Sequence, residues 1–347
     1  MNNKARGEKI RRQIVKDVRH HPADISKHIA NIFSITPQAV NSHTKKLEKE
    51  GWLISSGAGK GKRYFLGDLR EHRSLFPLTA ELTEDGVWRN QYSFVFEGLP
   101  ENIVDICHYG FTEMVNNAID HSGGKHIYIY VLRDKEKIII FVIDDGEGIF
   151  KKIKRLCDLH DERQALFELS KGKLTTDPDN HTGEGIFFTS RVFDEFEIDS
   201  KGVKFSHDDQ FEFDYILESD FSRNEAGTAV YMLIRRDSDR DIQAVFDEFA
   251  APDDFQFNKT VIPVRLAQYG NEKLVSRSQA KRLLVRIERF QNVIFDFYGV
   301  SSIGQAFADE IFRVYAKNHP NIVLLPVKME KNVEKMVSRA ISSKGAK

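Results

Sequence analysis

Residues 110–122 have the sequence GFTEMVNNAIDHS, and they end a segment with helical spacing that begins at Glu101. Apolar residues recur at the three- and four-residue intervals that bring side chains onto one face of a helix. The apolar face consists of Phe111, Val115, Ala118 and Ile119. Another face carries Glu113, Asn117 and Asp120. The pattern predicts a helix over residues 101–121 that buries one side and presents a carboxylate and an amide on another.

Two strand-like runs follow this helix, HIYIYVLR and KIIIFVI, and the chain continues with DDGEGI, residues 144–149. Acids beside glycines can ligate a metal, cap a helix or make room for a ligand. A calcium loop needs oxygen ligands at alternating positions and a glycine at the sixth. The residues before Asp144 are apolar, which excludes that loop. Taken alone, the motif is explained by a helix cap, in which Asp144 or Asp145 precedes a helix near Ile149.

Two further glycine motifs follow, HTGEGIFFTSRVF at residues 181–193 and EAGTAVYMLI at residues 225–234. Glycine lets the backbone approach phosphates closely, and a helix N-terminus offers free N–H groups to an anion. Neither motif continues into the GK[ST] of a P-loop, and no GxGxxG turn follows a strand. The sequence therefore excludes those two classes of phosphate-binding loop.

The order of these motifs resembles the GHKL ATPases, the superfamily of DNA gyrase, heat-shock chaperone, histidine kinase and mismatch-repair ATPases. The resemblance covers about residues 90–235. GFTEMVNNAIDHS resembles their N box, DDGEGI their D-x-G-x-G box, HTGEGI their second glycine box and AGTAV their late Gly-Thr. The residues at the matched positions are Glu113, Asn117, Asp144, Gly146, Gly148, Gly183, Gly185, Gly227 and Thr228.

The resemblance implies an ATP site that uses Mg²⁺. At its phosphate end, Asn117 would ligate Mg²⁺, and Glu113 would orient or deprotonate the attacking water. Gly183 and Gly185 would begin a helix whose N–H groups meet the phosphates. Phosphoryl transfer depends mainly on positioning and charge neutralisation, and a carboxylate within reach of the water can act as general base.

At the adenine end, the resemblance implies that Asp144 accepts a hydrogen bond from the adenine amino group, with support from Thr228. Gly148 would let the base lie close to the backbone, and Gly146 belongs to the same box. Asp145 and Glu147 fall at variable positions of the motif, where we expect only solvation or local capping.

Residues 150–182, between the two glycine boxes, would form a lid that orders on nucleotide binding. Lys171 and Lys173 could reach the γ-phosphate from this lid, or each could be a solvated surface lysine. A histidine kinase needs a two-helix dimerisation segment with an acceptor histidine just upstream of the ATPase domain. Residues 68–100 do not have that character, so we expect hydrolysis rather than histidine phosphorylation.

Charge separates the first part of the chain from the rest. Residues 1–66 carry 14 Lys and Arg against 5 Asp and Glu, whereas the whole chain of 347 residues has a net charge of −1. A basic module on an acidic body predicts a local site for a polyanion. Hydrophobic residues make up 41% of the chain, enough for a sizeable core.

The basic module resembles the winged helix-turn-helix family over about residues 5–67. Three stretches with helical spacing, the third starting at Thr36 and Pro37, precede the strand-like pieces WLIS and RYFLG. The resemblance implies that the third helix enters the DNA major groove and that the wing contacts the backbone. The alternative is a protein-docking module with solvated lysines. The candidate DNA-binding residues are Gln38, Asn41, Ser42, His43, Lys45, Lys46, Lys60, Lys62 and Arg63.

The last part of the chain alternates strand-like and helical segments, which predicts an α/β domain. VIFDFYGVSSIGQAFADEI resembles STAS domains, in particular the STAS-like domain found behind GHKL ATPase domains. The position of the phosphorylated serine of anti-sigma antagonists falls on Gln305 or Ala306, and Ser301 and Ser302 lie out of register. We therefore expect a docking or dimerisation module.

The predicted organisation is multidomain α+β. A winged helix (1–67) is joined by a linker (68–89) to a GHKL α/β sandwich (90–240) and a STAS-like domain (258–345). The main hypothesis is an ATP-hydrolysing regulator whose nucleotide state controls DNA binding or self-association. The alternatives are an anti-sigma-type serine/threonine protein kinase and a non-hydrolysing interaction protein. The expected partners are DNA, a protein bound to the STAS-like domain and a second copy in a homodimer.

Only two cysteines occur, which excludes a disulfide framework and fits a reducing compartment. No segment has the apolar length of a membrane span, and the first residues lack the apolar core of a secretory signal. We therefore expect a cytoplasmic protein with no membrane partner.

Overall fold

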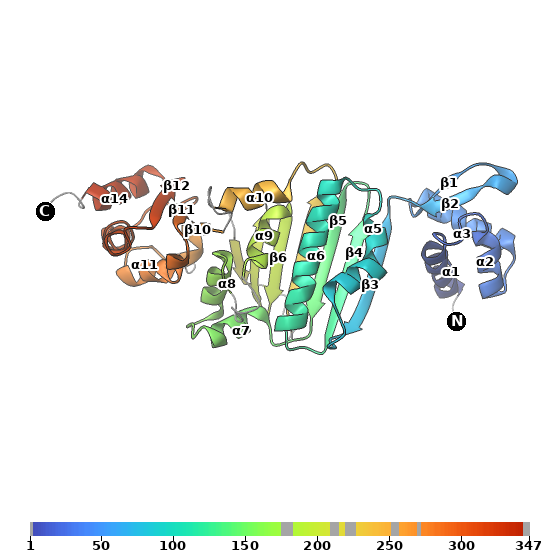
Figure 1. Cartoon of the computed structure of the whole chain (residues 1–347), viewed down its shortest axis with the longest axis horizontal. Helices are drawn as coiled ribbons and strands as arrows, with labels where there is room; N and C mark the ends of the chain where they lie inside the picture. The colour runs from blue at the N-terminus through green and yellow to red at the C-terminus, as the bar shows by residue number, and fades with distance from the viewer. Residues whose placement is uncertain are drawn as a thin grey trace.

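The computed structural model describes residues 3–174, 183–208, 215–218, 227–250, 257–268 and 272–342. Figure 1 shows three units along the long axis of the molecule, with a large sheet in the middle and a smaller unit at each end. The units are built around three hydrophobic clusters of buried residues. The predicted α+β composition is confirmed.

The N-terminal unit consists of three helices and a hairpin, as predicted. The helices are α1 (Asn3–Asp17), α2 (Ile25–Phe33) and α3 (Pro37–Lys49), and the antiparallel hairpin pairs β1 (Leu53–Ser56) with β2 (Arg63–Leu66) around a 3₁₀ turn, η1 (Gly59–Gly61). Thr36 caps α3, because its side chain accepts a hydrogen bond from the N–H of Ala39 at 3.2 Å, and Pro37 occupies the first turn. The assignment to the winged-helix class remains a prediction.

The central unit contains a seven-stranded antiparallel sheet in the order β3-β4-β5-β9-β6-β7-β8. Its strands are β3 (Arg70–Pro77), β4 (His126–Arg133), β5 (Lys137–Asp144), β6 (Glu195–Ser200), β7 (Val203–Asp208), β8 (Tyr215–Glu218) and β9 (Ala229–Arg235). The predicted long helix is α6 (Glu101–His121), which lies across one face of the sheet (Figure 1). Its apolar side enters the main core, which includes Phe111 and Val115.

The remaining helices of this unit surround α6. They are α4 (Glu84–Val87), the π-helical turn η2 (Trp88–Tyr92), α5 (Ser93–Phe96), α7 (Ile149–Leu156), α8 (Glu162–Ser170), α9 (Gly185–Val192) and α10 (Ile242–Phe249).

The segment 68–89, predicted to be a linker, is instead part of the central unit. Strand β3 forms the edge of the large sheet and pairs with β4 along eight residues, from Arg70 opposite Arg133 to Pro77 opposite His126. Buried Val87 and Trp88 join the main core. The alternation along β3 is weak because an edge strand is partly exposed on both faces, and this hides the strand in the sequence.

The C-terminal unit is the predicted α/β domain. Its parallel sheet has the order β10-β11-β12, with strands β10 (Lys259–Pro263), β11 (Asn292–Asp296) and β12 (Val323–Val327). The helical elements are η3 (Val264–Ala267), α11 (Arg277–Leu284), η4 (Ile287–Arg289), α12 (Gln305–Asp309), η5 (Glu310–Tyr315), α13 (Ala316–Asn318) and α14 (Lys331–Ser342). Ser276 and Gln279 form a capping box at the start of α11.

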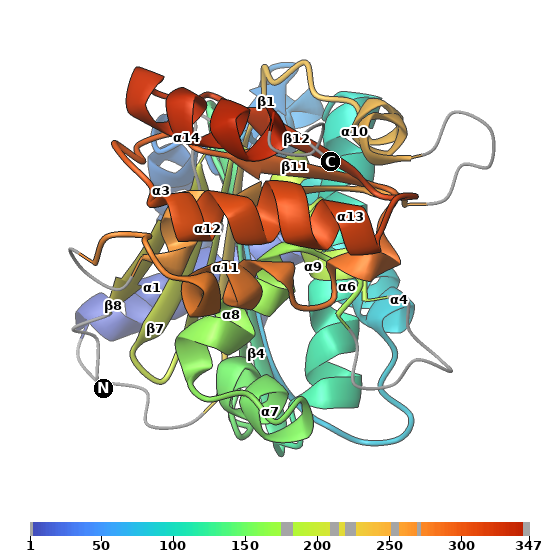
Figure 2. The same cartoon turned by 90° about the vertical axis from the view of Figure 1, so that its left-hand side faces the viewer.

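The C-terminal unit and the central unit share one hydrophobic cluster. Phe187 and Phe188 of α9 pack with Phe249 and Phe257, and all four belong to the cluster that contains the core of the C-terminal sheet. Figure 2, seen from the C-terminal end, shows α11 beside α8. The two units are therefore joined by packing as well as by the chain. Among the described helices, none is long and apolar enough to cross a membrane.

Candidate nucleotide-binding site

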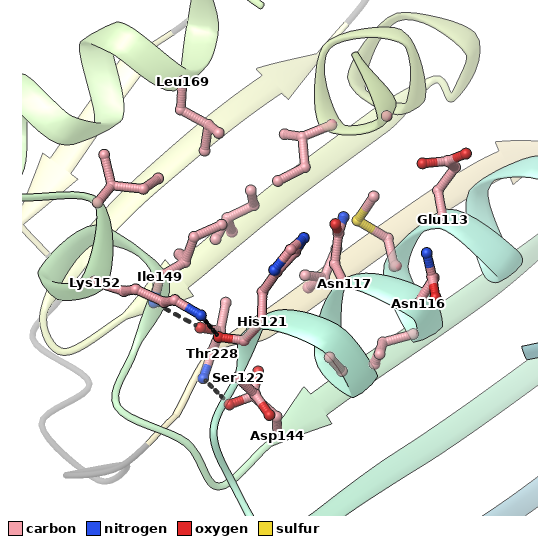
Figure 3. Close-up of a pocket in the computed structure, with 18 of the residues that line it drawn as sticks. Glu113, Asn116, Asn117, His121, Ser122, Asp144, Ile149, Lys152, Leu169 and Thr228 are labelled. Atoms are coloured by element: carbon pink, nitrogen blue, oxygen red, sulfur yellow. Dashed lines mark hydrogen bonds between the residues drawn. The ribbon is translucent and has the colours of Figure 1, made fainter. Parts of the chain in front are cut away.

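A cavity of about 310 Å³ lies between α6, the end of β5, α7 and the start of α9 (Figure 3). Sequence-predicted residues from all four motifs line it, namely Glu113, Asn117, Asp144, Gly148, Gly183, Gly185 and Thr228. The walls also include the apolar side chains of Val142, Ile149, Ile153, Leu169, Leu174, Ile186, Ile198 and Val230. The fold thus brings together residues that lie more than a hundred positions apart in the chain.

Asp144 is a buried carboxylate at one end of this cavity. Burial alternates along β5, so that Asp144 follows Ile140 and Val142 on the inward face of the strand. Its Oδ1 accepts hydrogen bonds from the N–H groups of Gly146 at 2.8 Å and Thr228 at 3.3 Å. Burial raises its pKa to about 6, against the effect of these two donors. A polar ligand that donates a hydrogen bond would suit such a carboxylate.

Thr228 connects β9 to the two neighbouring segments. Its carbonyl accepts a hydrogen bond from the N–H of Asp144 at 3.0 Å, and its Oγ1 accepts one from the N–H of Ile149 at 3.0 Å. Together with its N–H bond to Asp144, these contacts fix the end of β5 and the start of α7 (Figure 3). These contacts place Thr228 beside Asp144, and its supporting role in an adenine contact stays a prediction.

Glycines allow these segments to meet. A methyl group on Gly146 would clash with the carbonyl oxygen of Ser122 at the end of α6, and one on Gly227 would clash with the carbonyl of Asp144. Gly148 has φ +88° and immediately precedes α7. An L side chain at Gly148 would be strained, whatever space surrounded it.

The other two acids of DDGEGI have local partners, as predicted. Asp145 accepts hydrogen bonds from the N–H groups of Lys125 at 2.6 Å and His126 at 2.8 Å and contacts the His126 ring. These bonds lower its pKa to about 2, led by the backbone N–H of His126. Glu147 pairs with Arg155 at 2.7 Å. Neither acid lines the cavity.

The polar face of α6 forms the other end of the cavity. Figure 3 shows Glu113 and Asn117 on this face, with Asp144 at the opposite end. Asn117 Nδ2 is buried and has no hydrogen-bond partner among the described residues. A buried amide without a partner is costly, so a ligand that occupied the cavity would satisfy it.

The Asn117 amide also fits a Mg²⁺ ion held mainly by phosphate oxygens and water. A half-turn of the amide exchanges its nitrogen and oxygen, which brings an oxygen ligand to the same point. Within the described ranges, no group of three or more His, Cys, Asp or Glu side chains is arranged to hold a metal. Mg²⁺ commonly uses one or two protein ligands beside substrate phosphates, and the single Asn117 amide is consistent with this coordination.

The second glycine box meets α6 at the phosphate end. Gly183 has φ +73°, and a side chain there would collide with the backbone of Leu174. Gly185 begins α9, and a methyl group on it would clash with Glu113 Oε2. The N-terminus of α9 therefore lies against the carboxylate of Glu113, and both line the cavity. His181 and Thr182 of the motif lie outside the described residues.

Four polar residues of the cavity were not predicted as site residues: Asn116, His121, Ser122 and Lys152. The Nζ of Lys152 donates a hydrogen bond to the carbonyl of His121 at 2.6 Å (Figure 3). Helical spacing could have identified Lys152, because Ile149, Lys152 and Ile153 fall on one face of the helix that follows Gly148.

Lys171 and Lys173, considered as residues for the γ-phosphate, lie elsewhere. Lys171 is buried, and its Nζ pairs with Glu168 at 2.7 Å and donates to the carbonyl of Val285 at 2.8 Å. The Nζ of Lys173 donates to the carbonyl of Arg289 at 3.2 Å. Neither lysine lines the cavity, because both side chains turn toward the C-terminal unit. The predicted cofactor role of Lys173 is therefore not supported by this structure.

Most candidate DNA-binding residues are on the surface of the N-terminal unit. Gln38, Asn41, Ser42, Lys45, Lys46 and Arg63 are exposed. His43 is half-buried, and its pKa is lowered by burial and then by Arg11 and Lys46. Lys62 turns back onto α3, where it pairs with Glu48 at 3.3 Å and lies over the Tyr64 ring. The Lys60 side chain is outside the described part of the chain.

Comparison with known families finds matches for the central and C-terminal units. Residues 88–205 match a family described as the histidine kinase-like ATPase domain, and residues 279–334 match a STAS-like domain of unknown function. No curated protein matches the chain. The first match contains Glu113, Asn117, Asp144 and the glycines up to Gly185. The chain therefore contains a histidine kinase-like ATPase domain, which holds the cavity, and a C-terminal STAS-like domain of unknown function.

Proposed function

We propose that this protein binds ATP with Mg²⁺ in the cavity of the ATPase domain and hydrolyses it, and that nucleotide state controls DNA binding or self-association. One observation carries the proposal. A buried carboxylate with a raised pKa, Asp144, lies at one end of the cavity, and an unpartnered buried amide, Asn117, lies on the wall that leads to the N-terminus of α9 at the other end. The buried carboxylate suits the amino group of adenine, and the helix N-terminus suits the phosphates.

At the adenine end, the ionised Asp144 accepts a hydrogen bond from the exocyclic amino group. Its Oδ1 already accepts two backbone N–H bonds, and these hold the carboxylate in place. Val142, Ile198 and Val230 supply apolar walls for the flat base. Guanine presents a carbonyl where adenine presents the amino group, so we expect discrimination against GTP.

At the phosphate end, Asn117 would hold the Mg²⁺ ion, and the N–H groups at the start of α9 would meet the phosphates. When bound, Mg²⁺ neutralises charge on the phosphate oxygens. Lys152 adds a cation in the wall. These contacts position the phosphates, and in phosphoryl transfer that positioning accounts for much of the catalysis.

Glu113 is the candidate general base. It lines the nucleotide cavity and also a second cavity of about 320 Å³ on its other side, with Tyr109, Glu184 and Gln243. A carboxylate between two cavities can take a proton from a water that enters from the second and attacks a phosphate in the first. The contact with Gly185 holds Glu113 beside the phosphate-binding helix.

The contact between the lid region and the STAS-like domain supports control by nucleotide. The Thr260 hydroxyl donates to the carbonyl of Lys171 at 2.7 Å, and Arg289 donates to the carbonyl of Lys173 at 2.6 Å. The next residue, Leu174, is a wall of the cavity. A nucleotide that moved Leu174 would therefore act on the C-terminal domain.

DNA is the proposed partner of the N-terminal unit. The exposed polar side chains along α3 include Gln38, Asn41 and Lys45, types that bind base edges and phosphates. The docking or dimerisation role of the STAS-like domain and the homodimer remain part of the proposal. We also propose a cytoplasmic location, where ATP is available and where Cys107 and Cys157 can stay free thiols.

Turnover with ³²P-labelled ATP tests the enzymatic part. The wild type should release free phosphate without labelling protein, and Glu113→Gln should lower turnover by about 10²–10⁴-fold while it keeps ATP binding. Asp120→Asn, on the exposed surface of the same helix, is the control and should retain turnover. A wild type that binds ATP and never turns it over would refute hydrolysis.

A second candidate function is an anti-sigma-type serine/threonine protein kinase, which the pairing of the two matched domains favours. Ser301 and Ser302 are exposed in the loop between β11 and α12 and are the candidate acceptors within the chain. Mass spectrometry after incubation with ATP decides between the two functions. A phosphorylated Ser301 or Ser302, absent from Glu113→Gln, would favour the kinase.

A further inference from the structure

A third cavity, larger than the two described above, lies between the N-terminal unit and the ATPase domain. It has a volume of about 730 Å³, and its walls come from α1 on one side and from β3 and η2 on the other. We call it the α1–β3 cleft. Five cations line it: Arg11, Arg12, Lys16 and Arg19 from α1 and the stretch after it, and Arg73 from β3. Figure 1 shows α1 facing the edge of the large sheet.

The cations form one stripe because of helical spacing. Residues 8, 11, 12, 15, 16 and 19 all line the cleft, at the three- and four-residue intervals of one helix face. The opposite face of α1 buries Ile10, Ile14 and Val18 in the N-terminal core. One face of α1 is therefore packed in the N-terminal core, and the other lines the cleft.

Most of this positive charge is uncompensated. In the described ranges, Arg11, Arg12, Lys16 and Arg73 have no carboxylate within ion-pair distance, whereas Arg19 pairs with Glu97 at 2.5 Å. Three acids also line the cleft, Glu8, Glu50 and Glu71, and Glu50 pairs with Lys46 at 3.7 Å. Positive charge that is left unpaired at a rigid interdomain surface suits a polyanion.

The cleft is continuous with the candidate recognition helix. Leu47 and Glu50, near the end of α3, line it. Arg11 of α1 and His43 of α3 both lie beside Gly7. A Cβ atom placed on Gly7 would be 3.4 Å from the Arg11 side chain and 3.6 Å from the His43 ring. Burial, followed by Arg11 and Lys46, lowers the pKa of His43. Arg11, a cation of the cleft, therefore lies next to α3.

We propose that the α1–β3 cleft binds the phosphate backbone of the DNA duplex whose major groove α3 occupies, so that Arg73 of the ATPase domain contacts the same duplex. The inference rests on the proposed DNA binding. Arg11 and Lys16 are about 7.5 Å apart along the axis of α1. That length corresponds to about two phosphates of one DNA strand. DNA held in this way bridges the two domains and couples them directly.

The salt dependence of DNA binding tests the inference. For B-DNA, each phosphate contact contributes about 0.9 to the slope of log K against log salt. The full-length protein is titrated with a mixed-sequence duplex about three helical turns long. Arg73→Ala and Arg12→Ala should each reduce the slope by about 0.9. Arg155→Ala, an exposed arginine on α7 of the same domain, should leave it unchanged.

The outcomes separate this inference from the proposed function. If the wild type binds DNA and Arg73→Ala keeps the wild-type slope, the ATPase domain does not contact DNA and the inference is wrong. Lys45→Ala on α3 would still weaken binding in that case. If the wild type does not bind the duplex even at low salt, both the proposed DNA binding and this inference are wrong. Arg12 and Arg73 are exposed, so neither change removes a buried group.

Discussion

Two adjacent acids illustrate how strongly the environment of a carboxyl group sets its pKa. Asp144 and Asp145 are the same residue type, yet their pKa values lie near 6 and 2. Burial dominates at Asp144, and hydrogen bonds from the backbone and ring of His126 dominate at Asp145. The register of the motif predicted a ligand contact for Asp144 and not for Asp145, and of the two acids only Asp144 lines the cavity. The size of the separation could not be predicted, because it depends on partners from β4 and β9.

The raised pKa of Asp144 predicts that ATP affinity depends on pH. The ionised carboxylate accepts the adenine hydrogen bond, and this form is lost as the pH falls through about 6. We expect the Kd for ATP to be constant well above that value and to rise by up to about tenfold for each pH unit below it. Calorimetric titration between pH 5 and 8 measures this.

Asp144→Asn is the control for that titration, because its amide does not ionise. The variant should bind ATP weakly, with only the pH dependence that the phosphates of ATP themselves bring. An unchanged wild-type Kd from high pH to one unit below the pKa would show that Asp144 does not contact the base.

Among single residues, the position of Lys152 could be predicted from the sequence, whereas the position of Lys171 could not. Lys152 was within reach, because helical spacing after Gly148 gives its face. Lys171 was not, because its partner Val285 is 114 positions away. A local pattern carries no information on such a contact, so Lys171 looked the same as a phosphate-binding or solvated lysine.

At the scale of elements, the lid region between α8 and Leu174 is fastened to the STAS-like domain by buried charge. Burial lowers the pKa of Lys171 and raises that of Glu168, and the attraction between the two opposes both shifts. Such a pair costs free energy to bury, but removing one member costs more, because it leaves the other charge alone. The pair itself lies within the lid, and the bond from Lys171 Nζ to the Val285 carbonyl joins it to the STAS-like domain.

Removing one member of this pair should therefore cost more than removing both. Lys171→Met should lower the free energy of unfolding of the unit by about 3–5 kcal/mol, because Glu168 remains buried without its partner. Lys171→Met with Glu168→Met should recover most of that loss. Urea unfolding of the full chain measures the free energy of unfolding of each variant. ATP titration of the same variants then measures their nucleotide binding.

Lys281→Met is the matched surface control. Lys281 is 70% exposed and 4.0 Å from Glu310. Its replacement should cost less than about 1 kcal/mol. A similar cost for Lys171→Met and Lys281→Met would show that the buried pair does not fasten the lid.

Strand β3 shows a second limit at this scale. Its eight residues lie in a segment predicted to be a linker, and exposure on both faces left no clear alternation to detect. By contrast, β5 was predicted from its continuous apolar run, KIIIFVI, and its inward face is buried in the main core. Burial on a defined face is what makes an element visible in a sequence.

At the scale of the whole molecule, the shared aromatic cluster links α9 to the C-terminal domain. Phe187 and Phe188 follow Gly185, at which α9 begins beside the cavity, and they belong to the core of the STAS-like domain. The order of domains could be predicted from motifs. Their joint core could not, because apolar residues of α9 give no sign of which neighbour they pack against.

The shared core predicts a long-range response to nucleotide. Adding ATP and Mg²⁺ should slow hydrogen exchange in residues 285–290, which contact Lys171 and Lys173 but do not line the cavity. Arg289→Ala should weaken this response, since Arg289 donates to the carbonyl of Lys173. Protection confined to cavity residues in the wild type would contradict coupling between the domains.

The central claim is that DDGEGI supplies the adenine contact of an ATP site through Asp144. Calorimetric titration of ATP against the wild type, Asp144→Ala and Asp145→Ala tests it most directly. We predict that Asp144→Ala loses measurable binding, because the buried acceptor facing the cavity is gone. Asp145→Ala should largely keep binding, since Asp145 holds only the start of β4. Equal losses in the two variants would contradict the claim.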